Sequence, residues 1–141
     1  MTRDPGPELL VDTSIAVALS VMDHEGRAAA LAAVTGRRIG LAGHAAFESF
    51  SVLTRLPALA RRTPAAVGRL LAANFPHTRF LGRAATAALL LRLAEAGVSG
   101  GAVYDALVGA AAAECRVPLV TRDLRALGTY RVLDVDVVVV S

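Results

Sequence analysis

Four acidic residues of this sequence could act as one site, and each lies in a separate segment of the chain. They are Asp12, Glu48, Asp105 and Asp123. Four carboxylates cannot all ionise side by side unless cations neutralise them. Oxygen ligands without cysteine and with little histidine select a hard ion, Mg²⁺ or Mn²⁺, which activates water and stabilises a phosphoryl transition state, singly or as a pair. The pattern therefore predicts metal-dependent phosphoryl-transfer chemistry.

Asp12 and Asp123 are each predicted to follow a buried strand. The apolar run Leu9–Val11 ends at Asp12, and Asp123 lies just past the run Val117–Thr121. Sites in open parallel sheets lie outside the carboxyl ends of the strands, so the two acids would share one edge of the sheet. Each acid also has a structural alternative, because either could cap the helix that follows it.

Asp105 has the setting that most favours a site. On a helix that begins at Gly101, its neighbours three, four and seven residues away are all small or apolar. A carboxylate buried on such a face must be neutral, paired with arginine or bound to a cation. Glu114, nine residues later, falls about half a turn away and is predicted to face solvent.

Glu48 lies on the predicted helix Ala45–Arg55, at the border of its apolar stripe. The stripe runs through Phe47, Phe50, Leu53 and Thr54. A border acid often reaches out to water, which is the structural alternative for Glu48. His44, four residues earlier on the same face, could join it as a metal ligand or simply pack near the helix start.

Alternation of apolar strands with helices predicts the fold. The predicted strands are Leu9–Val11, Arg38–Leu41, Thr78–Leu81, Val117–Thr121, Tyr130–Leu133 and Val137–Val140. The predicted helices are Thr13–Val21, His24–Val34, Ala45–Arg55, Pro64–Ala73, Ala84–Ala96, Gly101–Cys115 and Asp123–Leu127. Strands separated by helices indicate a three-layer α/β/α sandwich with a central, mostly parallel sheet. We expect a single domain over residues 1–141, with a core from about residue 9 to residue 140.

Composition excludes several classes of enzyme. The chain has 141 residues, and all fifteen basic residues are arginine, so lysine is absent. A phosphate-loop NTPase, a Schiff-base enzyme and a receiver domain each need a lysine, and a haloacid-dehalogenase phosphatase would also need a second aspartate where Ser14 stands. The net charge is +3, and it becomes +7 (fifteen arginines against eight acids) when the four candidate acids are set aside. A positively charged surface around an acidic site suits the phosphates of a nucleic acid.

The sequence also bears on location. The single cysteine, Cys115, cannot form an internal disulfide and fits a reducing compartment. Apolar stretches stop well short of the about 18 residues that a membrane span requires. The apolar segment Thr13–Met22 follows residues of net negative charge (Arg3, Asp4, Glu8 and Asp12), the wrong sign for a signal peptide. We therefore expect a cytoplasmic protein that does not contact the membrane.

The order of the motifs resembles a PIN domain, and specifically a VapC-type toxin of a bacterial toxin–antitoxin pair. The motifs that carry the resemblance are Leu10–Ser14, Ala46–Pro57, Tyr104–Ala112 and Val120–Asp123. The resemblance extends from about Leu9 to Val140. It implies a Mg²⁺-dependent endoribonuclease, with Mn²⁺ as a possible substitute, in which activated water attacks the phosphodiester in line and leaves a 5′-phosphate and a 3′-hydroxyl.

The resemblance also implies roles for the acids. Asp12 and Asp105 would be the principal metal ligands. Glu48 and Asp123 would bind the ion through water or a second ion, and Glu48 would help to orient the attacking water. The position of Asp123 is the most variable of the four in such proteins.

Supporting residues and partners follow from the same resemblance. Thr13 or Ser14 would position Asp12, and Thr121 would form hydrogen bonds within the site. The partners would be RNA as substrate, a second copy of the chain in a homodimer, and a cognate antitoxin whose C-terminal arm covers the acidic pocket.

A non-catalytic PIN-like module that binds nucleic acid or another protein is the alternative. A module that binds single strands usually presents aromatic platforms. The six aromatic residues fall mostly on predicted helix stripes and strands, so no platform is predicted. Buried acids without a cation would also destabilise such a module. The sequence therefore favours the enzyme.

Overall fold

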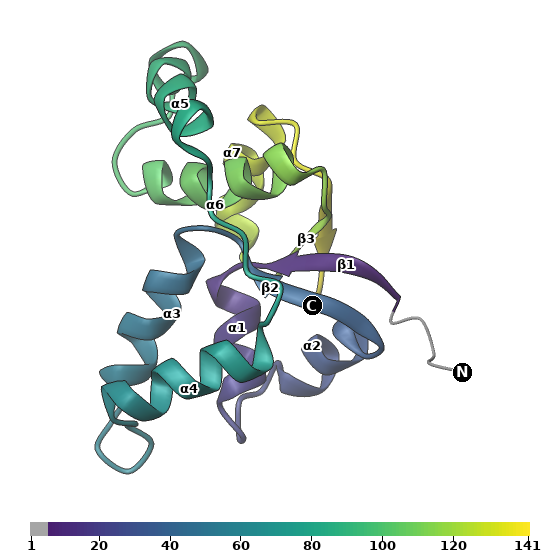
Figure 1. The fold of residues 1–141 in the computed structure, drawn as a ribbon, viewed down its shortest axis with the longest axis vertical. Coiled ribbons are helices and arrows are strands. Elements are labelled where there is room, and N and C mark those ends of the chain that lie inside the picture. The colour runs from purple at the N-terminus through teal and green to yellow at the C-terminus, as the bar shows by residue number, and fades with distance from the viewer. Residues whose placement is uncertain (1–5) are drawn as a thin grey trace.

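The computed structural model describes residues 6–141, which form a parallel sheet between two groups of helices (Figure 1). The strands are β1 (Gly6–Val11), β2 (Arg37–Leu41), β3 (Leu119–Thr121) and β4 (Val137–Val139). Their order is β2-β1-β3-β4, and every neighbouring pair is parallel. The predicted α/β/α sandwich is thus confirmed. The first five residues of the predicted domain, with Arg3 and Asp4, lie outside the described residues.

Helices cover both faces of the sheet. They are α1 (Thr13–Ser20), α2 (Arg27–Val34), α3 (Ala45–Thr54), α4 (Pro64–Asn74), α5 (Arg83–Ala96), α6 (Ala102–Cys115) and α7 (Leu127–Val132), with the short 3-10 turn η1 (Leu124–Ala126) before α7. In Figure 1, α1 to α4 lie below the sheet and α5 to α7 above it. Among residues 6–141, none of the helices combines the length and the apolarity needed to cross a bilayer.

Alternating residues of the central strands pack into two separate hydrophobic cores. Leu10 and Leu119 point into the core beneath α6 and α7, whereas Leu9, Val11 and Val120 point into the core beneath α1 and α2. Both faces of the strands are buried, which explains why β1 and β3 are apolar runs and not alternating sequences.

The carboxyl ends of β1 and β3 meet at one edge of the sheet. The two strands pair directly, with Val11 opposite Val120, and the amide of Asp12 donates to the carbonyl of Val120 at 3.2 Å. Asp12 and Asp123 therefore follow two neighbouring strands and share one edge of the sheet, as the sequence predicted.

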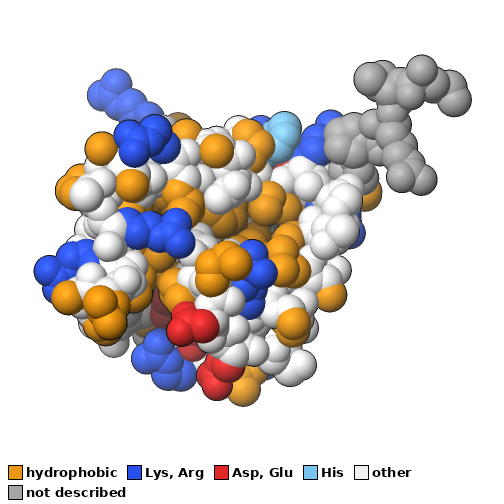
Figure 2. Space-filling model, turned by 90° about the horizontal axis from the view of Figure 1, so that it is seen from below, with side chains coloured by type: hydrophobic (Ala, Val, Ile, Leu, Met, Phe, Trp, Pro, Cys, Tyr) orange, Lys and Arg blue, Asp and Glu red, His pale blue; other side chains and the backbone are white. Residues whose placement is uncertain are grey.

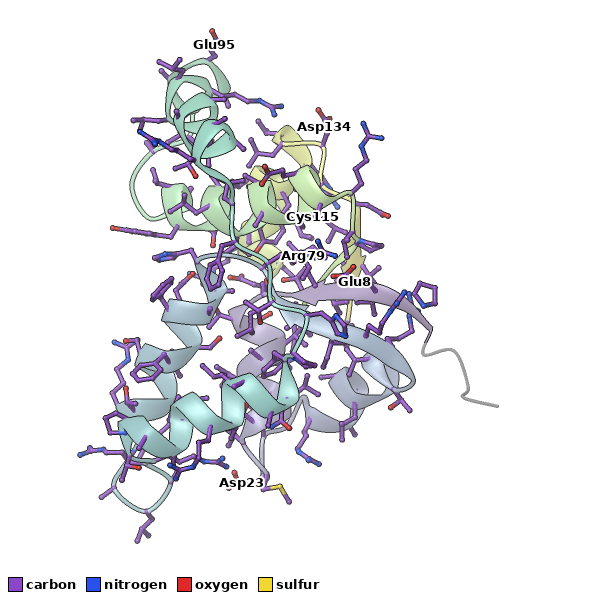
Figure 3. All side chains as sticks on the ribbon, in the orientation of Figure 1. Glu8, Asp23, Arg79, Glu95, Cys115 and Asp134 are labelled. Carbon is purple, nitrogen blue, oxygen red and sulfur yellow. The ribbon has the colours of Figure 1, made fainter. Side chains whose placement is uncertain are left out.

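The predicted strand Thr78–Leu81 is wrong, although its first residues do lie beside β2. His77 and Arg79 donate their amides to carbonyls of β2 at 3.1 Å each, but the amide of Leu41 bonds the hydroxyl of Thr78 at 3.0 Å and not a backbone carbonyl. The pairing is reduced to one isolated bridge, Ala42 to Arg79. Arg79 also binds Glu8 of β1 through two hydrogen bonds of 2.8 Å, a pair visible near the centre of Figure 3.

The predicted strand Tyr130–Leu133 is also wrong, because these residues belong to α7 and the turn that follows it. Tyrosine and valine favour strands, but burial of the Tyr130 ring and of Leu133 in the core beside α6 outweighs that preference. This difference matters for the site, since it turns the hydroxyl of Tyr130 toward the end of β1.

Candidate active site

Asp12 stands at the junction of β1 and α1 and is only 3% exposed. Its Oδ1 accepts hydrogen bonds from the hydroxyl of Ser14 at 2.6 Å and from the amide of Ile15 at 3.3 Å, so Asp12 also caps α1. Its Oδ2 accepts from the hydroxyl of Thr121 and, at 3.0 Å, from that of Tyr130. Burial raises the pKa of Asp12, and these hydrogen bonds oppose the rise.

Glu48 and Asp105 each stand in the first turn of a helix, α3 and α6 respectively. Both side chains are partly buried. Burial raises the pKa of Glu48, and the charges of Asp105, Asp12 and Asp123 raise it further, against the opposing effect of His44. Burial and the charge of Asp123 likewise raise the pKa of Asp105. The acids are therefore close enough to repel one another when ionised.

Asp123 is tied to a neighbouring arginine. Its Oδ1 accepts from the amide of Arg125 at 3.0 Å, which caps η1, and its carboxylate pairs with the Arg125 guanidinium at 3.2 Å. The structural alternative considered for Asp123, a helix cap, is thus present. Arg125 also lowers the pKa of Asp105, so one guanidinium supplies positive charge to two of the acids.

These side chains surround one pocket of about 260 Å³. The residues that line it are Thr13, Ser14, Glu48, Asp105, Val108, Asp123, Arg125 and Tyr130. Three of the four candidate acids therefore meet there. Asp12 does not line the pocket, but it is bonded directly to Ser14 and Tyr130, which do.

The supporting hydroxyls connect the acids to the ends of the strands. Ser14 donates to Asp12 and accepts from the amide of Arg122 at 2.9 Å. Thr121 donates to Asp12 and accepts from the amide of Asp123 at 3.0 Å, so it joins two candidate acids. Thr13 lines the pocket, and its buried hydroxyl has no hydrogen-bond partner among residues 6–141.

Tyr130 and Arg125 are site residues that the sequence analysis did not assign to the pocket. Tyr130 was expected on a strand, and no local pattern indicated that its hydroxyl would reach Asp12. Burial and the nearby carboxylates raise the pKa of Tyr130 strongly, which keeps the hydroxyl protonated as a donor. Arg125 follows Asp123 by two residues in the chain, and no pattern in the sequence indicated that its guanidinium would face the pocket.

The pocket suits a hard divalent cation in charge and in donor type. Its acids offer only oxygen atoms, they repel one another, and Thr13 adds a hydroxyl that has no partner in the described part of the chain. Within residues 6–141, however, no three His, Cys, Asp or Glu side chains are already close enough to hold a metal ion. Asp12 and Asp123 are occupied by hydrogen bonds and by Arg125, so an ion would have to draw the carboxylates inward.

The aromatic residues of α3 are more exposed than the sequence predicted. Phe47 and Phe50 were expected in an apolar stripe of α3, but Phe47 is 65% exposed, while Ala45, Ser49 and Leu53 are the buried residues of that helix. Rings of His44 and Tyr104 stack with centroids 5.2 Å apart. Phe47 and Tyr104, each next in the chain to a candidate acid, are thus more than half exposed and do not lie in a buried stripe.

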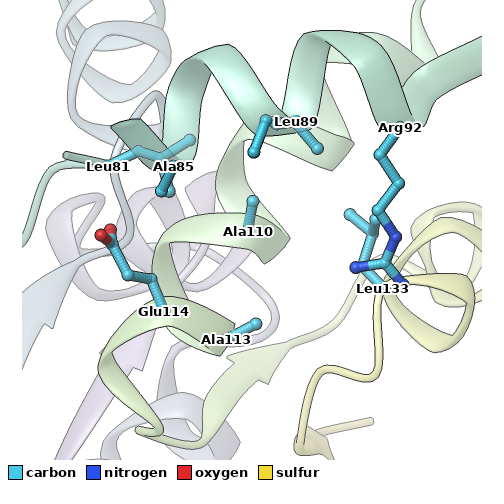
Figure 4. Close-up of a pocket in the computed structure, with 9 residues that line it drawn as sticks. Leu81, Ala85, Leu89, Arg92, Ala110, Ala113, Glu114 and Leu133 are labelled. Atoms are coloured by element: carbon cyan, nitrogen blue, oxygen red, sulfur yellow. The ribbon is translucent and has the colours of Figure 1, made fainter. Parts of the chain in front are cut away.

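Other hollows and acids have a different character. The pocket between α5 and α6 has an apolar floor, with Glu114 at one end and Arg92 at the other (Figure 4). Glu114 is exposed, as predicted, and its carboxylate accepts from the amide of Gly82 at 3.0 Å. Figure 3 places Asp23, Glu95 and Asp134 at the periphery, and none of these three acids lines the pocket of Glu48, Asp105 and Asp123.

Comparison with known proteins decides the family. The family model described as "PIN domain" matches residues 9–132. The chain belongs to the PIN domain family. It is 47% identical to Ribonuclease VapC27 of Mycobacterium tuberculosis over 96% of this chain and 98% of that protein. It is 46% identical to Ribonuclease VapC40 of the same species over 92% and 97%.

Solved structures share the fold of this PIN domain. A structure of VapBC2 from Rickettsia felis bound to a promoter DNA fragment contains a chain similar to it, with a TM-score of 0.68 and 13% identity over 95% of this chain and 99% of that one. PAE2754 from Pyrobaculum aerophilum gives a TM-score of 0.54 and 23% identity over 88% and 87%. These structures support the fold, while the family model and the two relatives confirm the VapC-type PIN domain inferred from the motif order.

Proposed function

We propose that this chain is a Mg²⁺-dependent endoribonuclease and the toxin of a toxin–antitoxin pair. The observation that carries the proposal is the meeting of Glu48, Asp105 and Asp123 around one pocket, one hydrogen bond away from the buried Asp12. The two relatives named as ribonucleases support RNA as the substrate.

The four acids would have different roles in binding the ion and activating water. Asp12 and Asp105 would hold the ion directly, and Glu48 and Asp123 would hold it through water or a second ion. Bound Mg²⁺, or Mn²⁺ in its place, supplies a Lewis acid that activates water and neutralises charge on the phosphoryl group. Glu48, whose pKa burial raises, would orient the attacking water and accept its proton.

Hydroxyl groups would keep the acids in place during the reaction. Ser14 and Thr121 bind opposite oxygens of Asp12 and hold its carboxylate plane. Thr13 lines the pocket, and its buried hydroxyl, which has no partner among residues 6–141, would turn to hydrogen-bond water or a phosphate oxygen there. Pre-set donors of this kind lower the cost of reorganisation when charge develops.

The surface supports a polyanionic substrate. Arginine side chains are spread over the face shown in Figure 2, and the acidic side chains gather in its lower part. Without the four proposed site acids, fifteen arginines stand against eight acids, a net +7. Arginine side chains of this surface would contact the phosphates of RNA, and such contacts bind RNA without reading its sequence.

Partners are part of the proposal. The structure from Rickettsia felis holds VapBC2, a toxin with its antitoxin by the family's naming, which supports a cognate antitoxin for this chain. We propose further that the chain acts as a single domain, assembles as a homodimer, and works in the cytoplasm, where its RNA substrate is found.

RNA cleavage by antitoxin-free protein tests the proposal. We expect a mixed RNA pool to be cut in Mg²⁺ or Mn²⁺, cutting to stop with chelator, and Asp105→Asn to lose at least about 100-fold in rate. Glu95→Gln, on the exposed side of α5, is the matched control and should cut normally. RNA binding without cleavage, unchanged by chelator and by Asp105→Asn, would refute the enzyme and favour the non-catalytic module.

A further inference from the structure

One side-chain donor to Asp12 comes from outside the motifs of the site. The hydroxyl of Tyr130, in α7, donates to Oδ2 of Asp12 at 3.0 Å. The other side-chain donors, Ser14 and Thr121, lie within two of the motif segments, and the amide donor Ile15 directly follows the first of them. Tyr130 reaches the carboxylate from the opposite core, beneath α6, and its side chain is 1% exposed. It also lines the pocket beside Glu48, Asp105 and Asp123.

The position of the Tyr130 ring depends on residue 109 being a glycine, which has no side chain. Gly109 lies in α6, one turn after Asp105, and a Cβ atom there would stand 2.9 Å from Cδ1 of Tyr130 and 3.1 Å from Cγ2 of Val135. The first distance is shorter than real Cβ contacts, and the ring is enclosed by the core. One helix thus directs Asp105 to the pocket and makes room for the ring that holds Asp12.

We propose that Tyr130 is a positioning residue for Asp12 and that Gly109 sets the position of its hydroxyl. The inference rests on the proposed metal-dependent function. Without this donor, Oδ2 would keep only the bond from Thr121, while Ser14 and Ile15 still bind Oδ1, so the carboxylate would be held less firmly at Oδ2. Asp12 is almost inaccessible to water, so no solvent molecule replaces the lost bond. Groups that orient a metal ligand commonly change metal affinity by about 10- to 100-fold.

Titration with Mn²⁺ in a calorimeter gives a readout that does not need activity. We expect Tyr130→Phe to raise the dissociation constant of Mn²⁺ about tenfold. Tyr104→Phe is the matched control, since the Tyr104 side chain is 52% exposed and should bind Mn²⁺ like the wild type. An unchanged or lower dissociation constant in Tyr130→Phe would overturn the inference. In RNA cleavage, we expect kcat to fall while KM stays within twofold.

A glycine pair tests the second half of the inference. We expect Gly109→Ala to weaken Mn²⁺ binding like Tyr130→Phe, because it displaces the ring. Gly128→Ala in α7, where an added Cβ meets nothing within 4 Å, should bind Mn²⁺ normally. Equal Mn²⁺ binding by folded Gly109→Ala and Gly128→Ala would refute the role of Gly109. If Gly109→Ala does not fold, Tyr130→Phe, which removes only one oxygen atom, still decides the role of Tyr130.

A metal-free measurement separates this inference from the proposed function. In chelator, the loss of melting temperature caused by Tyr130→Phe should be at least halved in an Asp12→Ala background, because the partner is already gone. Equal losses in both backgrounds would overturn the positioning role. Absence of Mn²⁺ binding by the wild type would refute the proposed metal site, and the chelator experiment would still decide whether Tyr130 holds Asp12.

Discussion

Thr121, the last residue of β3, donates its hydroxyl hydrogen to Oδ2 of Asp12, the first residue after β1. The same oxygen of Thr121 accepts the amide hydrogen of Asp123 at 3.0 Å. One side chain therefore links the carboxyl ends of two neighbouring strands and fixes two of the candidate acids relative to each other. Thr121 is fully buried, so this link has no competition from water.

Replacement of that hydroxyl should destabilise the fold. Thr121→Val keeps the side-chain shape but removes a hydrogen bond to a buried carboxylate, so the free energy of unfolding should fall by about 2 kcal/mol. Denaturant unfolding in chelator measures the change. Thr86→Val removes an exposed hydroxyl of α5 and should change stability by less than about 0.5 kcal/mol. Losses of equal size in the two variants would contradict the link.

Stability of the metal-free protein should fall with rising pH on account of Asp105. Burial and Asp123 raise the pKa of Asp105 above its ordinary value of 3.8. A raised pKa in the folded state means that stability is fully present below pH 3.8 and is lost as pH rises through the raised pKa. In chelator, Asp105→Asn should therefore gain melting temperature relative to wild type as pH rises from about 4 to about 7. A constant or shrinking difference would show that the pKa is not raised.

Removal of Arg125 should strengthen cation binding. Its guanidinium pairs with Asp123 at 3.2 Å and lowers the pKa of Asp105, so it occupies ligands that an ion would use. Arg125→Gln should lower the dissociation constant of Mn²⁺ several-fold at low ionic strength, with a smaller effect in high salt because the pair is exposed. Arg69→Gln, on the exposed surface of α4, is the control. Weaker binding by Arg125→Gln would mean that Arg125 helps to build the site.

Gly40 should not tolerate a side chain. A Cβ atom at this position of β2 would lie 2.0 Å from the backbone carbonyl atoms of His77, which runs beside the strand. Gly40→Ala should cost about 3 kcal/mol of unfolding free energy. Gly68→Ala in α4, which has open space, should instead stabilise by about 0.5 to 1 kcal/mol. Equal stability of the two variants would exclude the close approach.

Local patterns predicted the sheet edge well. The apolar runs before Asp12 and after Arg116 are buried on both faces, which is the property that a parallel central strand imposes on sequence. The small apolar neighbours of Asp105 likewise follow from the packing of α6. These features are encoded within a few residues of each acid, so one sequence suffices to find them.

The features that escaped prediction depend on contacts between distant segments. Tyr130 joins the site from 118 positions after Asp12, and burial against α6 decides its helical conformation. Phe47 appeared to belong to an apolar stripe because α3 was assumed to pack through it, whereas α3 packs through Ala45, Ser49 and Leu53. Periodicity shows that a helix has two faces, but not which neighbour covers them.

Thermal unfolding during titration with Mg²⁺ and Mn²⁺ tests the central claim most directly, that the acids form a divalent-cation site. An ion that binds only the folded protein must raise the melting temperature by mass action. We predict a rise for the wild type and for Glu95→Gln that is lost in Asp105→Asn. No rise in the wild type at millimolar ion, or a rise that persists unchanged in Asp105→Asn, would contradict the account.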